Sequence, residues 1–335
     1  MKAGGAISPP FLMNKIYTYL SAIIITGFAL CPPINFEVYI PDRNFLWIFL
    51  MFGFLGFYTI FLKVSIFIKL FSIYAFINSL CTTSPLVSQE AYILLIGCVY
   101  FYALCLQVKD WKVLSNCLMT FLILDIVLVL IQLFHKDKLL NFNLKENTCY
   151  GTVGNWMQLK CFLILCIAFL IALKKIKINK WLLSGLVVFI LTYFFKHNVF
   201  HNFLMCRGPV WLKTISLSSD HPFLGYGIGT FKFLFPGFQG QDIYALEGIW
   251  RHAHNFWVQL LFETGYIGLF IALLGMFVLV YKLLKNGLWH LLLGLSLVSY
   301  SLMFHFPDRQ SSTVLILVAF FAYTVKELRC QRNLK

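Results

Sequence analysis

The chain has 335 residues, of which 60% are hydrophobic and only 12% are charged. Because soluble domains carry about 25% charged residues, this composition excludes a soluble globular domain and predicts an integral membrane protein. The formal net charge of +14 comes from basic residues that stand between apolar blocks rather than in one patch. This distribution argues against a nucleic-acid partner and favours a role for these residues in membrane topology.

The apolar blocks have the length needed to cross a bilayer as helices, roughly 16 to 24 residues. They predict an all-α, polytopic protein with about 10 transmembrane helices. We place the spans at 16–34, 45–62, 64–81, 91–108, 113–134, 157–173, 181–195, 256–281, 287–305 and 311–325. The first block has no small-residue cleavage site, so we expect an uncleaved span. The ten cysteines have no metal-binding spacing.

Charge predicts the topology. One set of alternate connections contains 15 basic and 2 acidic residues, and the other contains 10 basic and 9 acidic residues. By the positive-inside rule the first set is cytoplasmic. The chain then divides into N-terminal transmembrane helices (1–195), an external, periplasmic loop (196–255) and C-terminal transmembrane helices (256–335), with both termini cytoplasmic. The cations kept on the outer side suggest that an anion is handled there.

The external loop contains two polar motifs. Gly208-Pro209 is typical of a helix start and predicts a short amphipathic helix at the membrane surface, which Asp220-His221-Pro222 ends. Gly225, Gly227 and Gly229 then alternate with other residues, a pattern that permits a ligand to approach peptide N–H groups closely.

The next predicted helix begins near His254. Asn255, Gln259, Glu263 and Tyr266 are spaced four, four and three residues apart, so they form one polar stripe on an apolar helix. We expect this stripe to face the bundle interior. Hydrogen bonding between helices and a part in the site are both open for Gln259 and Glu263.

These residues resemble a known family. His254-Asn255, followed after nine residues by Gly265-Tyr266-Ile267-Gly268, is similar to the His-Asn-x9-Gly-x-x-Gly signature of the O-antigen ligase and O-antigen polymerase family of membrane glycosyltransferases. The resemblance covers about residues 150–325. Its further elements are Arg207, Trp211, the run Pro222-x-x-Gly225-x-Gly227-x-Gly229-x-Phe231, and Gly151-x-x-Gly154-Asn155.

The resemblance implies transfer of a glycan from undecaprenyl pyrophosphate to an acceptor hydroxyl on the outer face of a bacterial inner membrane. The acceptor is a lipid A core sugar in ligases and a second lipid-linked glycan in polymerases. The implied reaction is inverting and needs neither a metal nor a cofactor. Arg207 and His254 match the family's catalytic positions. From their charge and position we add Arg251, Lys232, Arg309, Asn255 and the three glycines as substrate-binding candidates.

A rival class is a transporter or flippase of the same lipid-linked glycan. It would explain the external cations and Asp125 in the middle of the fifth span, for which a structural pair with a neighbouring helix is equally compatible. It also predicts a polar path across the bilayer with paired cytoplasmic charges, which the sequence does not show. The external histidines lack the carboxylate partner of a zinc motif, so we predict no metal site.

Overall fold

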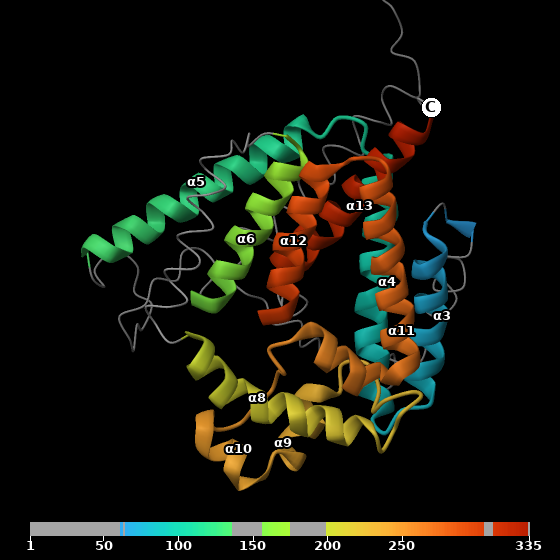
Figure 1. The fold of residues 1–335 in the computed structure, drawn as a ribbon, viewed down its shortest axis with the longest axis vertical. Coiled ribbons are helices and arrows are strands. Elements are labelled where there is room, and N and C mark those ends of the chain that lie inside the picture. Colours follow the sequence, from blue (N-terminus) through green and yellow to red (C-terminus); the bar gives the residue numbers. More distant parts are fainter. Residues whose placement is uncertain (1–60, 63, 136–155, 175–198, 305–310, 334–335) are drawn as a thin grey trace, which may run out of the picture.

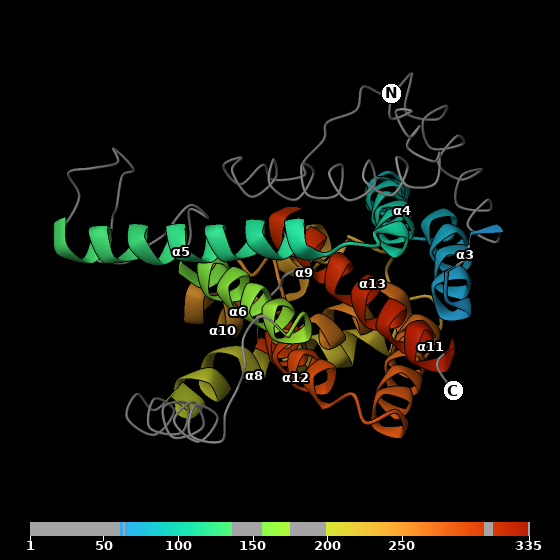
Figure 2. The same ribbon diagram turned by 90° about the horizontal axis from the view of Figure 1, so that it is seen from above.

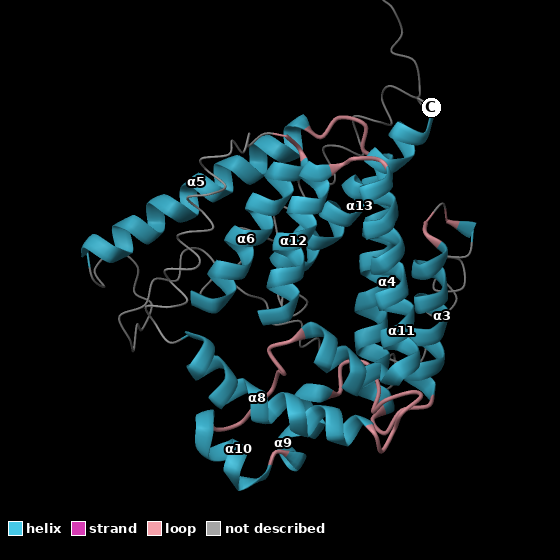
Figure 3. Ribbon diagram, viewed as in Figure 1, coloured by secondary structure: helices cyan, strands magenta, loops and turns pink. Residues whose placement is uncertain are grey.

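The structure, a computed structural model, describes residues 61–62, 64–135, 156–174, 199–304 and 311–333. This part of the chain consists of helices and the loops between them, without a strand (Figure 3). The all-α fold class predicted from the sequence is therefore confirmed for the described residues. The predicted spans 16–34 and 181–195, and all but the last two residues of 45–62, lie outside them.

The other predicted spans each coincide with a helix. Six of these helices stand side by side as a bundle (Figure 1). They are α3 (Ile66–Leu80), α4 (Pro85–Gln107), α6 (Trp156–Ala172), α11 (Phe256–Lys285), α12 (Trp289–Phe304) and α13 (Ser311–Asn333). Two of them, α4 and α11, are long and apolar enough to cross a membrane by length and composition. At 1.5 Å per residue, the part of α11 from residue 266 to residue 285 extends over about 30 Å.

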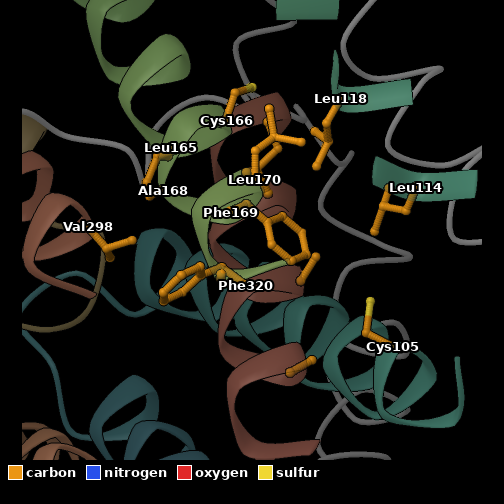
Figure 4. Close-up of a cluster of buried hydrophobic side chains, with 14 of the residues drawn as sticks. Cys105, Leu114, Leu118, Leu165, Cys166, Ala168, Phe169, Leu170, Val298 and Phe320 are labelled. Atoms are coloured by element: carbon orange, nitrogen blue, oxygen red, sulfur yellow. The ribbon is translucent and has the colours of Figure 1, made fainter. Parts of the chain in front are cut away.

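The main core lies where α6, α12 and α13 meet α4 and the first residues of the helix that follows α4 in the chain (Figure 4). Phe169 and Phe320 are fully buried there and pack edge to face with their ring centroids 6.1 Å apart. Gly294 lets α12 approach α6, because a Cβ atom at this position would lie 2.9 Å from the Ala168 carbonyl oxygen. Small residues at helix contacts are typical of membrane bundles.

The helix α5 (Lys112–His135) differs from a simple span. It matches the predicted range 113–134, but it runs obliquely across one end of the bundle and projects beyond it (Figures 1 and 2). Trp111 fixes its start, because the indole packs edge to face against Phe169 and Tyr323. In the first part of α5, Leu114 and Leu118 belong to the core, whereas Ile123 and Ile126 are exposed. The side chain of Asp125 lies outside the described residues.

The predicted external loop contains three helices rather than one short helix. They are α8 (Val199–Ser218), α9 (Phe231–Phe238) and α10 (Gly240–Glu247), and they lie across the end of the bundle where α11 begins (Figure 1). We call residues 199–255 the end layer. Its helix α8 does not start at Pro209, as we predicted, but runs through it. Proline removes one helical hydrogen bond, and the buried face with Val210, Thr214 and Ser218 holds the helix in place.

Basic residues gather at the opposite end of the bundle, which we call the Lys-rich end. The α4–α5 and α11–α12 connections and the chain's C-terminus lie there (Figure 1). Two cavities at this end are lined by Lys109, Lys112, Lys282, Lys285, Lys326 and Arg329. Among the described residues, the α4–α5 and α11–α12 connections, which we predicted to be cytoplasmic, thus lie at the end of the bundle opposite the end layer, which we predicted to be external.

Candidate functional site

A break in α11 organises the region that contains the motifs. Gly265 has φ 61° and ψ −169°, so the helix is interrupted there. In a regular helix the carbonyl groups of Phe262 and Glu263 would accept hydrogen bonds from residues 266 and 267. Here they accept from the N–H groups of Tyr226 and Gly227, each at 2.9 Å. The glycine loop, residues 222–230, therefore completes the hydrogen bonding of the broken helix.

A further hydrogen bond joins α11 to the glycine loop, and in this one α11 is the donor. The N–H group of Tyr266 donates to the Pro222 carbonyl at 2.7 Å. Gly225 and Gly265 allow the two backbones to meet, since a Cβ at Gly225 would lie 2.5 Å from the Phe262 oxygen and one at Gly265 would lie 2.6 Å from the Phe223 oxygen. Both also have positive φ angles that other residues rarely adopt. The two glycine motifs are thus two halves of one joint.

The glycine loop was predicted to offer its N–H groups to a ligand, and the structure gives these groups another role. The Gly225 N–H donates to the His221 carbonyl at 2.8 Å, that of Ile228 to Asn78 Oδ1 at 2.9 Å, and that of Gly229 to Glu263 Oε2 at 2.8 Å. Because these donors are already used within the protein, close packing of the backbone explains the glycines without a ligand. A part for Gly225, Gly227 and Gly229 in substrate binding stays a prediction.

The polar stripe of α11 holds the end layer. Glu263 and Gln259 are 7% and 5% exposed, and the Gln259 amide donates to Glu263 Oε1 at 3.0 Å. Gln259 Oε1 accepts from the Ala253 N–H at 3.3 Å. Tyr266 is 48% exposed, because the break at Gly265 turns it away from this row. The stripe therefore faces the end layer and excludes Tyr266, whereas we expected all four residues to face the bundle interior.

Helix α3 and the residues after it hold the joint as well, which the sequence analysis did not anticipate. The Tyr74 hydroxyl donates to the carbonyls of Thr264 and Phe223, and the Thr83 hydroxyl donates to the Tyr226 carbonyl at 3.0 Å. Asn78 is 1% exposed and binds the Ile228 N–H. The available signal was the polar residue Asn78 near the end of this hydrophobic helix, followed by the pair Thr82-Thr83.

His254 has a left-handed backbone conformation, with φ 52°. A residue with a side chain in this region is uncommon and is held there by its surroundings. Both polar backbone groups of Ala253 are bound: its N–H by Gln259 and its carbonyl by the Trp211 indole N–H, at 2.6 Å. On the other side Asn255 caps α11, accepting from the N–H groups of residues 257 and 258. The half-buried imidazole is thus held between two fixed neighbours.

Arg207 is half-buried on α8 and lies one turn before Trp211. Residues four apart share a helix face, so Arg207 lies on the face of α8 whose Trp211 binds the Ala253 carbonyl. The end layer therefore brings together the two positions that match the family's catalytic residues, although they are 47 residues apart in the sequence. The Trp250 ring packs edge to face on His254, with centroids 5.5 Å apart.

The other candidate cations are more dispersed. Arg251 is exposed and lies three residues before His254. Lys232 is on α9, with its ammonium group 4.6 Å from the centroid of the Phe233 ring. Arg309 lies outside the described residues.

The electrostatics around His254 favour an anion. The residue directly precedes the first segment of α11, residues 256–264, whose N-terminal dipole attracts negative charge, and Arg207 and Arg251 are on neighbouring segments. At the far side of the glycine loop, burial raises the pKa of Tyr226, and the Asp220 carboxylate 3.4 Å away raises it further. Tyr226 therefore stays neutral and donates to Asp220.

Among the described residues no group of three His, Cys, Asp or Glu side chains is placed to hold a metal ion.

A scan of protein-family models finds no match to the chain, and a search of curated proteins finds no similar sequence. The likeness to O-antigen ligases and polymerases therefore rests on the motif residues themselves.

Proposed function

We propose that the protein is a polytopic membrane glycosyltransferase of the O-antigen ligase or polymerase type, which transfers a glycan from undecaprenyl pyrophosphate to a sugar hydroxyl. The observation that carries this proposal is the joint that fixes His254 at the start of α11 beside the Arg207 face of α8. A strained, positioned histidine near an arginine is typical of sites where a reaction takes place.

The orientation in the membrane follows from the two ends of the bundle. The Lys-rich end is cytoplasmic by the positive-inside rule, so the end layer lies at the outer surface of a bacterial inner membrane. The acceptor there is a lipid A core sugar for a ligase or a second lipid-linked glycan for a polymerase. Helices of membrane-crossing length in α4 and α11 support this placement.

The chemistry requires stabilisation of a leaving group and removal of one proton. The acceptor oxygen forms a bond to the anomeric carbon from the face opposite the leaving group, the bond from that carbon to the phosphate oxygen breaks, and the configuration inverts. Negative charge grows on the departing undecaprenyl pyrophosphate, where Arg207 offers a guanidinium group and Arg251 a second one. The hydroxyl proton goes to His254 acting as a base, a contribution of about 10² to 10⁴-fold. In the alternative role His254 donates a hydrogen bond to the pyrophosphate.

The first experiment is a surface-glycan ladder on a gel from cells that lack the gene. A polymerase defect leaves core carrying a single repeat unit, whereas a ligase defect leaves bare core while long lipid-linked chains accumulate. An unchanged ladder would contradict the proposed function.

The site assignment is tested in the same strain by complementation. We expect R207A and H254A to insert normally and to lose glycan transfer by at least about 100-fold. The matched control is Lys213→Ala, which removes an exposed cation from the same helix α8 and is expected to restore the ladder. The pH dependence of the rate separates the two roles of His254, because a base must be neutral and loses activity below its pKa, whereas a charged donor loses activity above it.

A further inference from the structure

A large cavity lies between α3, α4, α11 and α13, and it extends from Phe256 and Leu260 near the start of α11 to the Lys-rich end. Its volume is about 990 Å³, near the upper limit for pockets that hold small molecules. The lining is almost entirely apolar and includes Phe71, Val99, Met276 and Phe321. Beyond Phe256 and Leu260, the lining on α11 continues from Ile271 to Lys285, and this stretch alone is about 21 Å long at 1.5 Å per residue. One leaflet of a bilayer has about 15 Å of hydrocarbon, so the cavity is long enough for one acyl chain.

The charged residues of this lining stand at one end. Lys282, Lys285 and Arg329 line the cavity where α11 and α13 reach the Lys-rich end. All three are exposed on the protein surface. An apolar channel with cations at its mouth is complementary to an amphiphile with an anionic head. Basic pockets between helices on the cytoplasmic side bind the head groups of anionic lipids.

A buried hydroxyl group points to the same ligand. Tyr102 lines the cavity and is 5% exposed. Within the described part of the chain its hydroxyl group has no hydrogen-bond partner, and leaving a buried donor without a partner is unfavourable. Arg329 is close enough to interact with Tyr102 electrostatically. A phosphate or ester oxygen at the mouth of the cavity would satisfy this hydroxyl.

We propose that this cavity binds an anionic phospholipid of the cytoplasmic leaflet, with one acyl chain in the channel and the phosphate at Lys282, Lys285 and Arg329. The glycan donor does not fit this arrangement, because its pyrophosphate belongs at the end layer, at the other end of the bundle. The inference rests on the proposed insertion in the membrane and not on glycan transfer. The proposed lipid is a structural ligand of the cavity and takes no part in glycan transfer.

The test uses the full chain purified in maltoside detergent, titrated with phosphatidylglycerol or with phosphatidylcholine carrying identical acyl chains. A ligand that binds only the folded state raises the melting temperature. We expect phosphatidylglycerol to bind at least about tenfold more tightly, and K282Q and R329Q each to weaken it about 5-fold, as expected for one cation near a lipid surface. Y102F is expected to weaken it by a similar factor, and Ala272→Phe, which fills the channel, to abolish binding of both lipids.

The matched control is Lys112→Gln, which removes an exposed cation from the same end but from a different cavity. It should bind phosphatidylglycerol like the wild type. Equal stabilisation by both lipids, or equal weakening by K112Q and K282Q, would overturn the proposal. Preferential stabilisation by undecaprenyl phosphate would assign the cavity to the donor lipid instead. Because no transfer is measured, this result is independent of the glycan ladder.

Discussion

The core of the bundle and the joint between the glycine loop and α11 are held together in different ways. In the core, residues such as Phe169 and Phe320 fill space, and many apolar side chains of similar size would serve. In the joint, backbone groups of Phe262, Glu263, Tyr226 and Gly227 bind one another directly. Such contacts require glycine where the two backbones meet, and each depends on a single hydrogen bond. Few substitutions are therefore tolerated at these positions.

This difference explains where the recognisable motifs fall. A bundle of apolar helices leaves little trace in a sequence beyond hydropathy, whereas the joint demands glycine at particular positions and polar residues at others. The joint also fixes His254, since Gln259 binds both Glu263 in the joint and the Ala253 N–H beside the histidine. The motif that resembles a family signature is therefore partly an architectural requirement for presenting one side chain.

The largest expected effect on stability comes from adding a methyl group where the glycine loop meets α11. Gly225→Ala places its Cβ 2.5 Å from the Phe262 carbonyl oxygen, which is backbone and cannot move aside, at a positive φ. We expect a loss of more than about 4 kcal/mol in the free energy of unfolding, measured in detergent.

Two other glycines separate the causes. Gly248→Ala has open space but a backbone with φ 80° and ψ −135°, which residues other than glycine rarely adopt, and should cost about 1–3 kcal/mol. Gly97 lies within α4 and has nothing near its Cβ position, so Gly97→Ala should raise the free energy of unfolding by about 0.5–1 kcal/mol. Equal stability of G225A and G248A would contradict the backbone contact.

A smaller effect is expected from the buried carboxylate of the joint. Glu263→Leu leaves the Gly229 N–H and the Gln259 amide without their acceptor, at a cost of about 2–3 kcal/mol. The comparison in the bundle is Thr324→Val, because this buried hydroxyl binds only a carbonyl of its own helix, that of Phe320. We expect it to cost less than about 1 kcal/mol. A similar loss of melting temperature in both variants would remove the distinction between the two regions.

The smallest effect on stability belongs to His254. His254→Gly removes the strain of a left-handed residue but frees the unfolded chain, so the free energy of unfolding should change by less than about 1 kcal/mol. Lys174 has φ 57° after the end of α6 and provides the comparison. Both glycine variants should fold, and only H254G should lose glycan transfer. Retained transfer by H254G would remove the imidazole from the mechanism.

Hydropathy predicted the helices well. The predicted spans 64–81 and 157–173 differ from α3 and α6 by no more than two residues at either end, because an apolar block of that length has few other ways to satisfy its backbone. The direction of α5 could not be predicted. Its sequence is apolar on all sides, so the packing of Trp111 and the contact with α6, rather than a polar face, set its course.

The candidate site was predicted only in part. His254 and Arg207 were singled out because they belong to motifs, and the structure brings their segments together through Trp211 and Ala253. The close backbone packing of the glycines was not anticipated, because alternating glycines look the same whether they face a ligand or another part of the backbone. Tyr74 and Asn78 were missed, because their partners Thr264 and Glu263 lie 190 and 185 positions away, and a polar residue in a helix does not by itself indicate its partner.

The sequence by itself determined the helices, the charge difference between the two ends and the presence of a polar motif region, because hydropathy, charge and glycine content act locally along the chain. Only the tertiary structure decided that α11 breaks at Gly265 and that the glycine loop supplies the hydrogen bonds missing at this break. It also decided that an apolar cavity has its cations at the Lys-rich end, opposite the end layer. These features arise where segments distant in sequence meet, and they depend on which backbone groups and side chains are brought together in space.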